Sequence, residues 1–211
     1  MRKSPTFAIV QHFCAALILG SAIGAQAQGS PALLQYFPAF VAGTDPVLRA
    51  DGTTVIAGGL ARTFPSHTFA VVGLSPDGTP DRGFGAGGIV KLTVWGASES
   101  ARYLVARADG KLLVSGIAID PSVRCTSQRY PCPNRFIALF RLNPDGVRDS
   151  SFGDRGRVVF SVAGSDGHDL TPGTYQLSPQ PDGTTLIEGV ADQYGDPRPI
   201  TVRVGSCRNS S

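Results

Sequence analysis

Apolar runs separated by turn residues recur three times along the chain. Each copy has an apolar run, an Asp-Gly turn and a second apolar run with a glycine near its end. The copies are Val47-LRADGTTVIAGG, Leu104-VARADGKLLVSGI and Leu177-SPQPDGTTLIEGV. Two apolar runs joined by Asp-Gly are typical of a β-hairpin, because glycine accepts the positive φ of the tight turn. The pattern predicts three hairpins whose turns lie 58 and 73 residues apart, a spacing found in propellers and solenoids.

Further apolar runs flank each hairpin. Tyr36-FPAFVAG, Val90-KLTVWGA and Val158-VFSVAG precede the hairpins, and Phe69-AVVGL, Phe136-IALFRL and Ile200-TVRV follow them. Four runs in each copy predict a four-stranded antiparallel meander. We therefore expect an all-β fold of three tandem four-stranded units, about residues 34–75, 89–142 and 157–204, with a propeller-like or incomplete β-propeller architecture. Trp95 lies within one of these strand-like runs and is expected in the core.

A second motif joins the units, as Ser75-PDGTPDRGFGAGG and Asn143-PDGVRDSSFGDRG. Pro-Asp-Gly predicts a tight turn, and Phe84 and Phe152 are each expected to be buried. A calcium loop of the EF-hand kind needs alternating oxygen ligands and a closing glutamate, which this motif lacks. We therefore interpret its aspartates as structural.

The two motifs together resemble the delta-60 repeat family, which consists of bacterial proteins built from tandem units of about this length. The pattern is R-x-DG-K-x-L-V-x-G followed by F-x-L-x-R-L-N-PDG-x-x-D-x-S-FG-x-x-G. It fits best from Arg107 to Gly156 and covers most of the chain after residue 27. The third copy ends at Pro199-ITVRVG without a PDG connector. The resemblance implies a propeller-like β-repeat and supplies no catalytic motif.

The N-terminus has the pattern of a secretory signal peptide over residues 1–27. Arg2 and Lys3 form its basic part, residues 7–23 its mostly apolar part, and Ala25-Gln26-Ala27 its cleavage site. A membrane anchor is the alternative, but Gln11 and His12 interrupt an apolar run shorter than the ~20 residues that a span needs. We expect residues 28–211 to form a single β-repeat domain that is exported, to the periplasm or the exterior, with no transmembrane segment.

Charge and cysteine content narrow the expected partners. Cleavage would remove two of the three formal net positive charges, and no lysine or arginine run suggests a nucleic-acid groove. Cys125 and Cys132 share one loop, and in an oxidising compartment we expect a disulfide between them. The loop has too few ligands for zinc, so we expect no metal. Cys207 is left over, either free or available for an intermolecular bond.

A meander places the Asp-Gly turns and the PDG connectors at one end and the dissimilar loops at the other. These loops are Leu60-ARTFPSHT, Ile119-DPSVRCTSQRYPCPN, Ala191-DQYGDPRP and Gly164-SDGHDLTPG. Dissimilar loops on a regular scaffold often carry binding specificity. The alternative is that they are tolerated insertions, because lengthening a surface loop costs little free energy. The candidate binding residues are Arg62, His67, Arg124, Arg129, Tyr130, His168, Tyr194 and Arg198.

These features favour a non-catalytic exported binding or scaffold module that recognises a protein or envelope component. No Gly-x-Ser-x-Gly elbow, paired Cys-His signature or phosphate loop is present, so we predict no catalytic residues and no cofactor. A propeller-type enzyme, of hydrolase or sugar-dehydrogenase kind, and a glycan-binding protein remain as alternatives. Arg141, which aligns with Gly73 and Arg203, is interpreted as a structural or rim residue. Three blades are fewer than the four to eight of closed propellers, which leaves a compact bundle and a homo-oligomeric ring both open.

Overall fold

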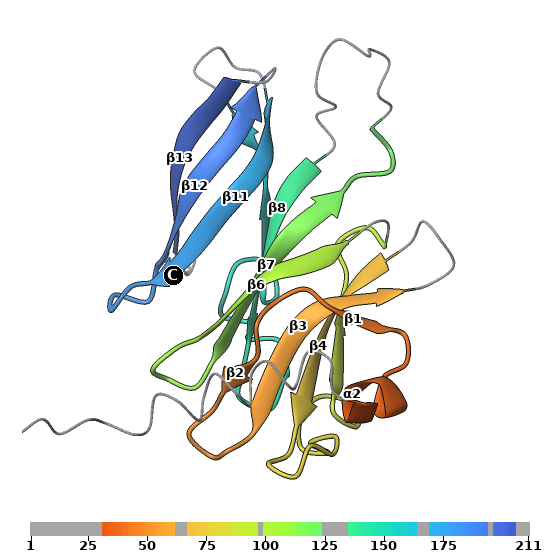
Figure 1. Cartoon of the computed structure of the whole chain (residues 1–211). Helices are drawn as coiled ribbons and strands as arrows, with labels where there is room; N and C mark the ends of the chain where they lie inside the picture. The colour runs from red at the N-terminus through yellow and green to blue at the C-terminus, as the bar shows by residue number, and fades with distance from the viewer. Residues whose placement is uncertain are drawn as a thin grey trace, which may run out of the picture.

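A computed structural model of the chain describes residues 31–61, 67–96, 99–123, 135–163, 169–193 and 196–205. These residues form three antiparallel β-sheets and one short helix, as Figure 1 shows. Sheet 1 contains β1 (Phe40–Ala42), β2 (Val47–Leu48), β3 (Thr54–Ala61), β4 (His67–Leu74) and β5 (Ile89–Leu92). Sheet 2 contains β6 (Ser100–Ala106), β7 (Leu112–Ile119), β8 (Arg135–Leu142) and β9 (Arg157–Phe160). Sheet 3 contains β10 (Val162–Ala163), β11 (Asp169–Pro179), β12 (Thr185–Gln193) and β13 (Asp196–Val204).

The three predicted hairpins are present as β2–β3, β6–β7 and β11–β12. Their turn glycines, Gly52, Gly110 and Gly183, all have φ near +80°. In each turn the aspartate Oδ1 accepts a hydrogen bond from the backbone N–H two residues later, so the local chemistry of the turn repeats with the sequence.

The division into sheets differs from the expected four-stranded units. Sheet 1 has five strands, because β1 and β2 pair with different parts of β3. Strand β5, expected to begin the second unit, instead pairs with β4, and β9, expected to begin the third, pairs with β8. The connector after β4 folds back on its own sheet, and its Gly88 carbonyl accepts a hydrogen bond from the Gly73 N–H. Each PDG connector therefore lies inside a sheet and not between two sheets.

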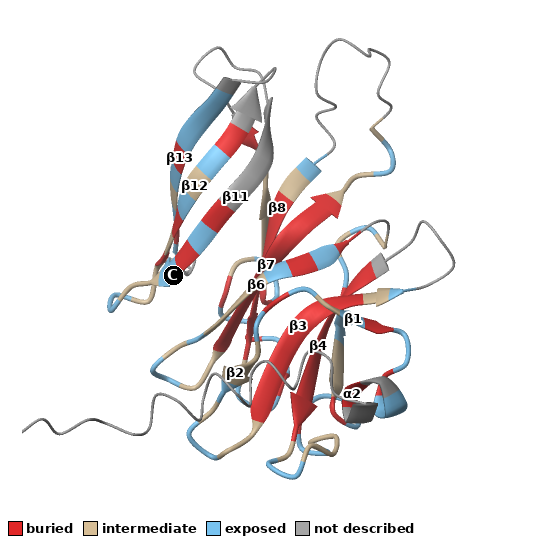
Figure 2. Ribbon diagram, viewed as in Figure 1, coloured by how far each residue is buried: buried red, intermediate tan, exposed pale blue. Residues whose placement is uncertain are grey.

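Consecutive sheets pack through two apolar cores. Sheets 1 and 2 share a core that includes Phe69, Phe84 and Phe140, and sheets 2 and 3 share one that includes Phe152 and Tyr175. Both faces of sheet 2 are therefore covered. This explains why the central strands β7 and β8 are almost uninterrupted apolar runs, which appear mostly red in Figure 2, apart from the start of β8. Within the described residues the sheets form an open series, because no strand of sheet 3 pairs with one of sheet 1 there.

The two outer faces of this series differ. The helix α2 (Pro31–Tyr36) and the segment after it cover part of the outer face of sheet 1, where Leu33, Phe37 and Phe40 pack on Ile56 and Val72. The outer face of sheet 3 is mostly polar and exposed, as the pale blue positions of β12 and β13 in Figure 2 show. Its exposed side chains are Gln176, Ser178, Glu188, Val190, Pro199, Thr201 and Arg203. A polar outer face is typical of the terminal unit of a repeat array.

The connectors also link neighbouring sheets. The N–H of Gly85, in the first connector, donates to the carbonyl of Asp145, in the second, at 2.7 Å. Gly146 fits directly against the first connector, because a Cβ there would lie 2.7 Å from Val90 Cγ2 and 3.1 Å from Phe84 Cε2. The Pro-Asp-Gly turn of one sheet thus docks into the Phe-Gly corner of the sheet before it.

Candidate functional site

The strand registers place the Asp-Gly turns and connectors at one end and the other connections at the opposite end, as expected. Thr54 pairs with Leu74 at the connector end, while Ala61 pairs with His67 beside the first variable loop. Residues 120–134 join β7 to β8 at the same end, which we call the loop end.

Most of the predicted binding residues lie outside the described residues. These are Arg62, Arg124, Arg129, Tyr130, His168 and Tyr194, together with Cys125, Cys132 and Cys207. His67 is described in its backbone, as the first residue of β4. Arg198 is exposed on β13 and pairs with Ala191 of β12.

Two loops expected at this end are shorter than predicted. The segment Ala191-DQYGDPRP is mostly strand, since β12 extends to Gln193 and β13 begins at Asp196. Pro197 and Pro199 are accommodated because β13 is the edge strand of sheet 3, where a missing N–H costs no ladder bond. Strand β11 similarly begins at Asp169, within the segment expected as a loop.

Trp95 was expected in the core, and the structure corrects this. Its side chain is 37% exposed at the loop end, where the chain leaves β5. Its ring meets Phe136, the second residue of β8, edge to face with 5.0 Å between centroids. The aromatic pair therefore bridges sheets 1 and 2 at their shared rim. Strand β5 ends at Leu92, although the alternating pattern continues to residue 94. The prediction that Trp95 lies in a strand and in the core is wrong for this reason.

Glu99 holds the backbone that carries Trp95. Its carboxylate oxygen Oε1 accepts hydrogen bonds from the backbone N–H groups of Val94, Trp95 and Gly96, at 3.0, 2.6 and 3.0 Å. The side chain is fully buried, and Oε2 receives no hydrogen bond from the described residues. A charged acceptor for three amides is a strong constraint, so the loop presents Trp95 from a fixed backbone. Glu99 could not be identified from the sequence, because a single glutamate between two apolar runs resembles an ordinary surface residue.

A pocket of about 540 Å³ opens beside this loop, on the outer face of sheet 1. One wall is the segment 37–39 that follows helix α2, and the floor includes Leu60 and Ile89. Lys91 lines the pocket from β5, and Thr93 and Gly96 line it from the loop that carries Trp95. The pocket exists because the helix and its extension cover only part of the apolar face of sheet 1.

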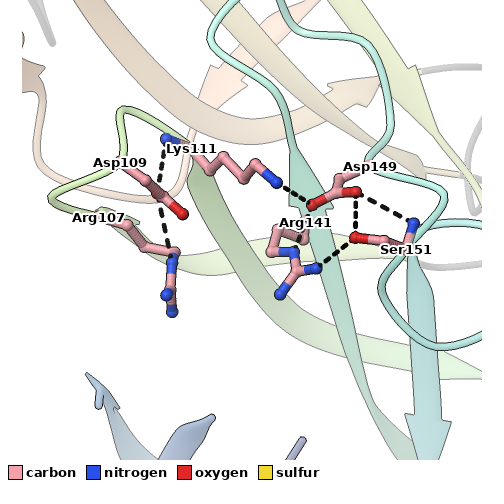
Figure 3. Close-up of polar contacts among 6 residues, drawn as sticks. All are labelled: Arg107, Asp109, Lys111, Arg141, Asp149 and Ser151. Carbon is pink, nitrogen blue, oxygen red and sulfur yellow. Dashed lines mark hydrogen bonds and ion pairs between the residues drawn. The ribbon is translucent and has the colours of Figure 1, made fainter. Parts of the chain in front are cut away.

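The opposite end holds a group of charged side chains, drawn in Figure 3. Asp149 Oδ2 accepts hydrogen bonds from Lys111 Nζ and Arg141 Nε, each at 2.7 Å, and Ser151 Oγ bonds Asp149 Oδ1. Arg141 also lies over the Phe152 ring, 4.6 Å from its centroid. Burial disfavours the charge of Asp149, but the hydrogen bonds from Lys111 and Ser151 and the charge of Arg141 outweigh it and hold its pKa well below the usual range.

This cluster is structural. Arg141 and Asp149 are each 8% exposed in their side chains, Lys111 and Arg141 both pair with Asp149, and Arg141 Nη2 donates to Ser151 Oγ. The cluster fastens the second connector to β8 through Arg141 and to the turn before β7 through Lys111, which agrees with the interpretation of Arg141 as a structural residue. In sheet 1, Gly73 of β4 takes the place of Arg141, and the Phe84 ring of the first connector fills the space, with its Cγ 2.8 Å from the position of an added Cβ.

Within the described residues, no three histidine, cysteine, aspartate or glutamate side chains lie close enough to hold a metal ion. No helix among these residues is sufficiently long and apolar to cross a membrane.

A model of the family described as "Domain of unknown function (DUF5122) beta-propeller" matches residues 133–152. This short match includes β8 and the second connector as far as Phe152, and it supports a propeller-like repeat family. No curated protein and no solved structure matches the chain.

Proposed function

We propose that the chain is an exported, non-catalytic β-repeat protein of the delta-60 kind that recognises a protein or cell-envelope component through its loop end. The N-terminal signal pattern of residues 1–27 supports export. The repeated hairpin and connector motifs support the family.

The observation that carries the binding role is the exposed Trp95. Exposed tryptophans are frequent anchors of protein interfaces, because a large rigid ring buries much area at little entropic cost. Trp95 stands on Phe136 and on a loop fixed by Glu99. It is therefore already ordered, and little conformational entropy would be lost when a partner covers it.

The test compares two exposed apolar side chains at opposite ends of the protein. The immobilised chain is used to capture its partner from an envelope extract, and the affinity for that partner is then measured with Trp95→Ala and Val147→Ser. Val147 is 56% exposed in the second connector and is the control. We expect Trp95→Ala to weaken binding by about tenfold or more and Val147→Ser to leave it unchanged. Equal affinity of both variants would refute recognition through the loop end.

A further inference from the structure

The pocket on the outer face of sheet 1 has a composition that selects a ligand class. Leu60, Ala61, Ile89 and the segment 37–39 provide an apolar surface. Its volume of about 540 Å³ lies in the range of about 300–1,000 Å³ that small-molecule sites occupy. An apolar group of modest size would therefore remove much of this surface from water.

The formal charge lining the pocket is positive. Lys91 is the only charged side chain among the described residues that line it, and no carboxylate lines it there. The ion pairs of the described residues do not include Lys91, which extends from an exposed position on β5. Thr68 and Thr93 also line the pocket and add neutral hydroxyl groups. An ammonium group beside an apolar surface complements a ligand with an apolar body and one negative charge.

We propose that this pocket binds a small apolar carboxylate, with the carboxylate paired to Lys91 Nζ and the apolar body against Leu60 and Ile89. A single ammonium group matches one carboxylate, whereas a phosphate is usually met by several donors or by arginine forks. This inference concerns a small ligand and does not rest on the recognition of a macromolecular partner.

The chain provides its own reporter for the test, since Trp95 is the only tryptophan and follows two residues after the pocket-lining Thr93. The full chain is titrated with 3-phenylpropionate and with its neutral amide, 3-phenylpropionamide, while Trp95 fluorescence is recorded. Saturation-transfer NMR of the same ligands measures binding if the fluorescence does not change. We expect the carboxylate to bind about fivefold more tightly than the amide, the magnitude of one partly exposed ion pair, and this preference to shrink as salt is added.

Three variants distinguish binding in the pocket from a general effect of net charge and from a loss of folding. Lys91→Met keeps the alkyl stem and should abolish the preference for the carboxylate over the amide. Ala39→Phe fills the pocket and should weaken both ligands. Arg155→Gln removes one charge from an exposed position in the second connector and should change neither affinity. Circular dichroism melting curves confirm that each variant is folded.

Equal binding of the carboxylate and the amide would overturn the proposal, as would an unchanged preference in Lys91→Met. Failure of both ligands to saturate at millimolar concentration by NMR would overturn it as well. Loss of partner binding in Trp95→Ala together with unchanged ligand binding in Lys91→Met would refute the carboxylate site alone and leave the proposed function standing.

Discussion

Replacing Asp149 with asparagine should destabilise the protein far more than the same change at Asp81. The two aspartates occupy equivalent places in the two connectors, and each accepts a hydrogen bond at Oδ1 from the backbone N–H two residues later. Asparagine can keep that bond. The two sites differ in their charged partners, since Lys111 and Arg141 contact Asp149, whereas no ion pair within the described residues reaches Asp81.

The size of the expected loss in free energy of unfolding follows from how far the ion pair is buried. Asp149→Asn leaves the Arg141 guanidinium, 8% exposed, without a counter-charge, and breaking a buried ion pair in this way costs about 3–5 kcal/mol. Lys111 is 29% exposed and can turn to water, which lowers the expected cost to about 2–4 kcal/mol. For a chain of this size, this corresponds to a fall in Tm of about 5–15 °C. Asp81→Asn should stay within about 0.5 kcal/mol, as for an ordinary surface change.

Urea unfolding followed by circular dichroism at pH 7 gives both free energies of unfolding. The pH dependence supplies a second check. The folded pKa of Asp149 is depressed, so its stabilisation is fully present above the unfolded value near 3.8 and is lost as the pH falls towards the folded pKa. The stability gap between wild type and Asp149→Asn should therefore narrow below pH 4. Similar losses for Asp149→Asn and Asp81→Asn, or a gap that stays constant down to pH 2, would contradict the ion-pair argument.

Three further predictions concern packing, a buried hydrogen bond and assembly. Gly146→Ala should cost about 1–3 kcal/mol more stability than Gly78→Ala. Both glycines have φ near +84°, but only Gly146 is docked against Val90. Equal losses of stability in thermal melts would show that the turn does not dock. Tyr175→Phe should cost about 1 kcal/mol of stability, because it removes the 2.8 Å hydrogen bond between Tyr175 Oη and Ser115 Oγ. Ser115 Oγ would still donate its hydrogen bond to the Ala138 carbonyl. An unchanged urea midpoint would count against the bond to Tyr175. Light scattering should give a monomer in reducing and non-reducing buffer, since the outer face of sheet 3 is polar; a dimer in both would instead support a ring of two chains.

Local features of the fold could be predicted from the sequence, because they depend on residues that are neighbours in the chain. The Asp-Gly and Pro-Asp-Gly turns were located correctly, since glycine conformation and the aspartate hydrogen bond act over a few residues. The separation of turns and variable loops to opposite ends followed from strand order alone. The site was predicted less well. Trp95 was assigned to the core, and Glu99 and the pocket were not anticipated. The binding residues proposed for the variable loops stay a prediction, because most of them lie outside the described residues.

The sequence by itself determined where the hairpins form and which strands are buried on both faces. Residues 136–140 are uniformly apolar and lie between two sheets. Ile200-TVRV alternates, with Ile200 and Val204 in the core and Thr201 and Arg203 on the polar outer face. Only the tertiary structure decided that β5 and β9 close the preceding sheets, that helix α2 leaves a pocket uncovered, and that Trp95 meets Phe136. The physical reason is that turn chemistry is a short-range property of a few residues. Strand partners and exposure depend instead on surfaces brought together by packing between residues far apart in the chain.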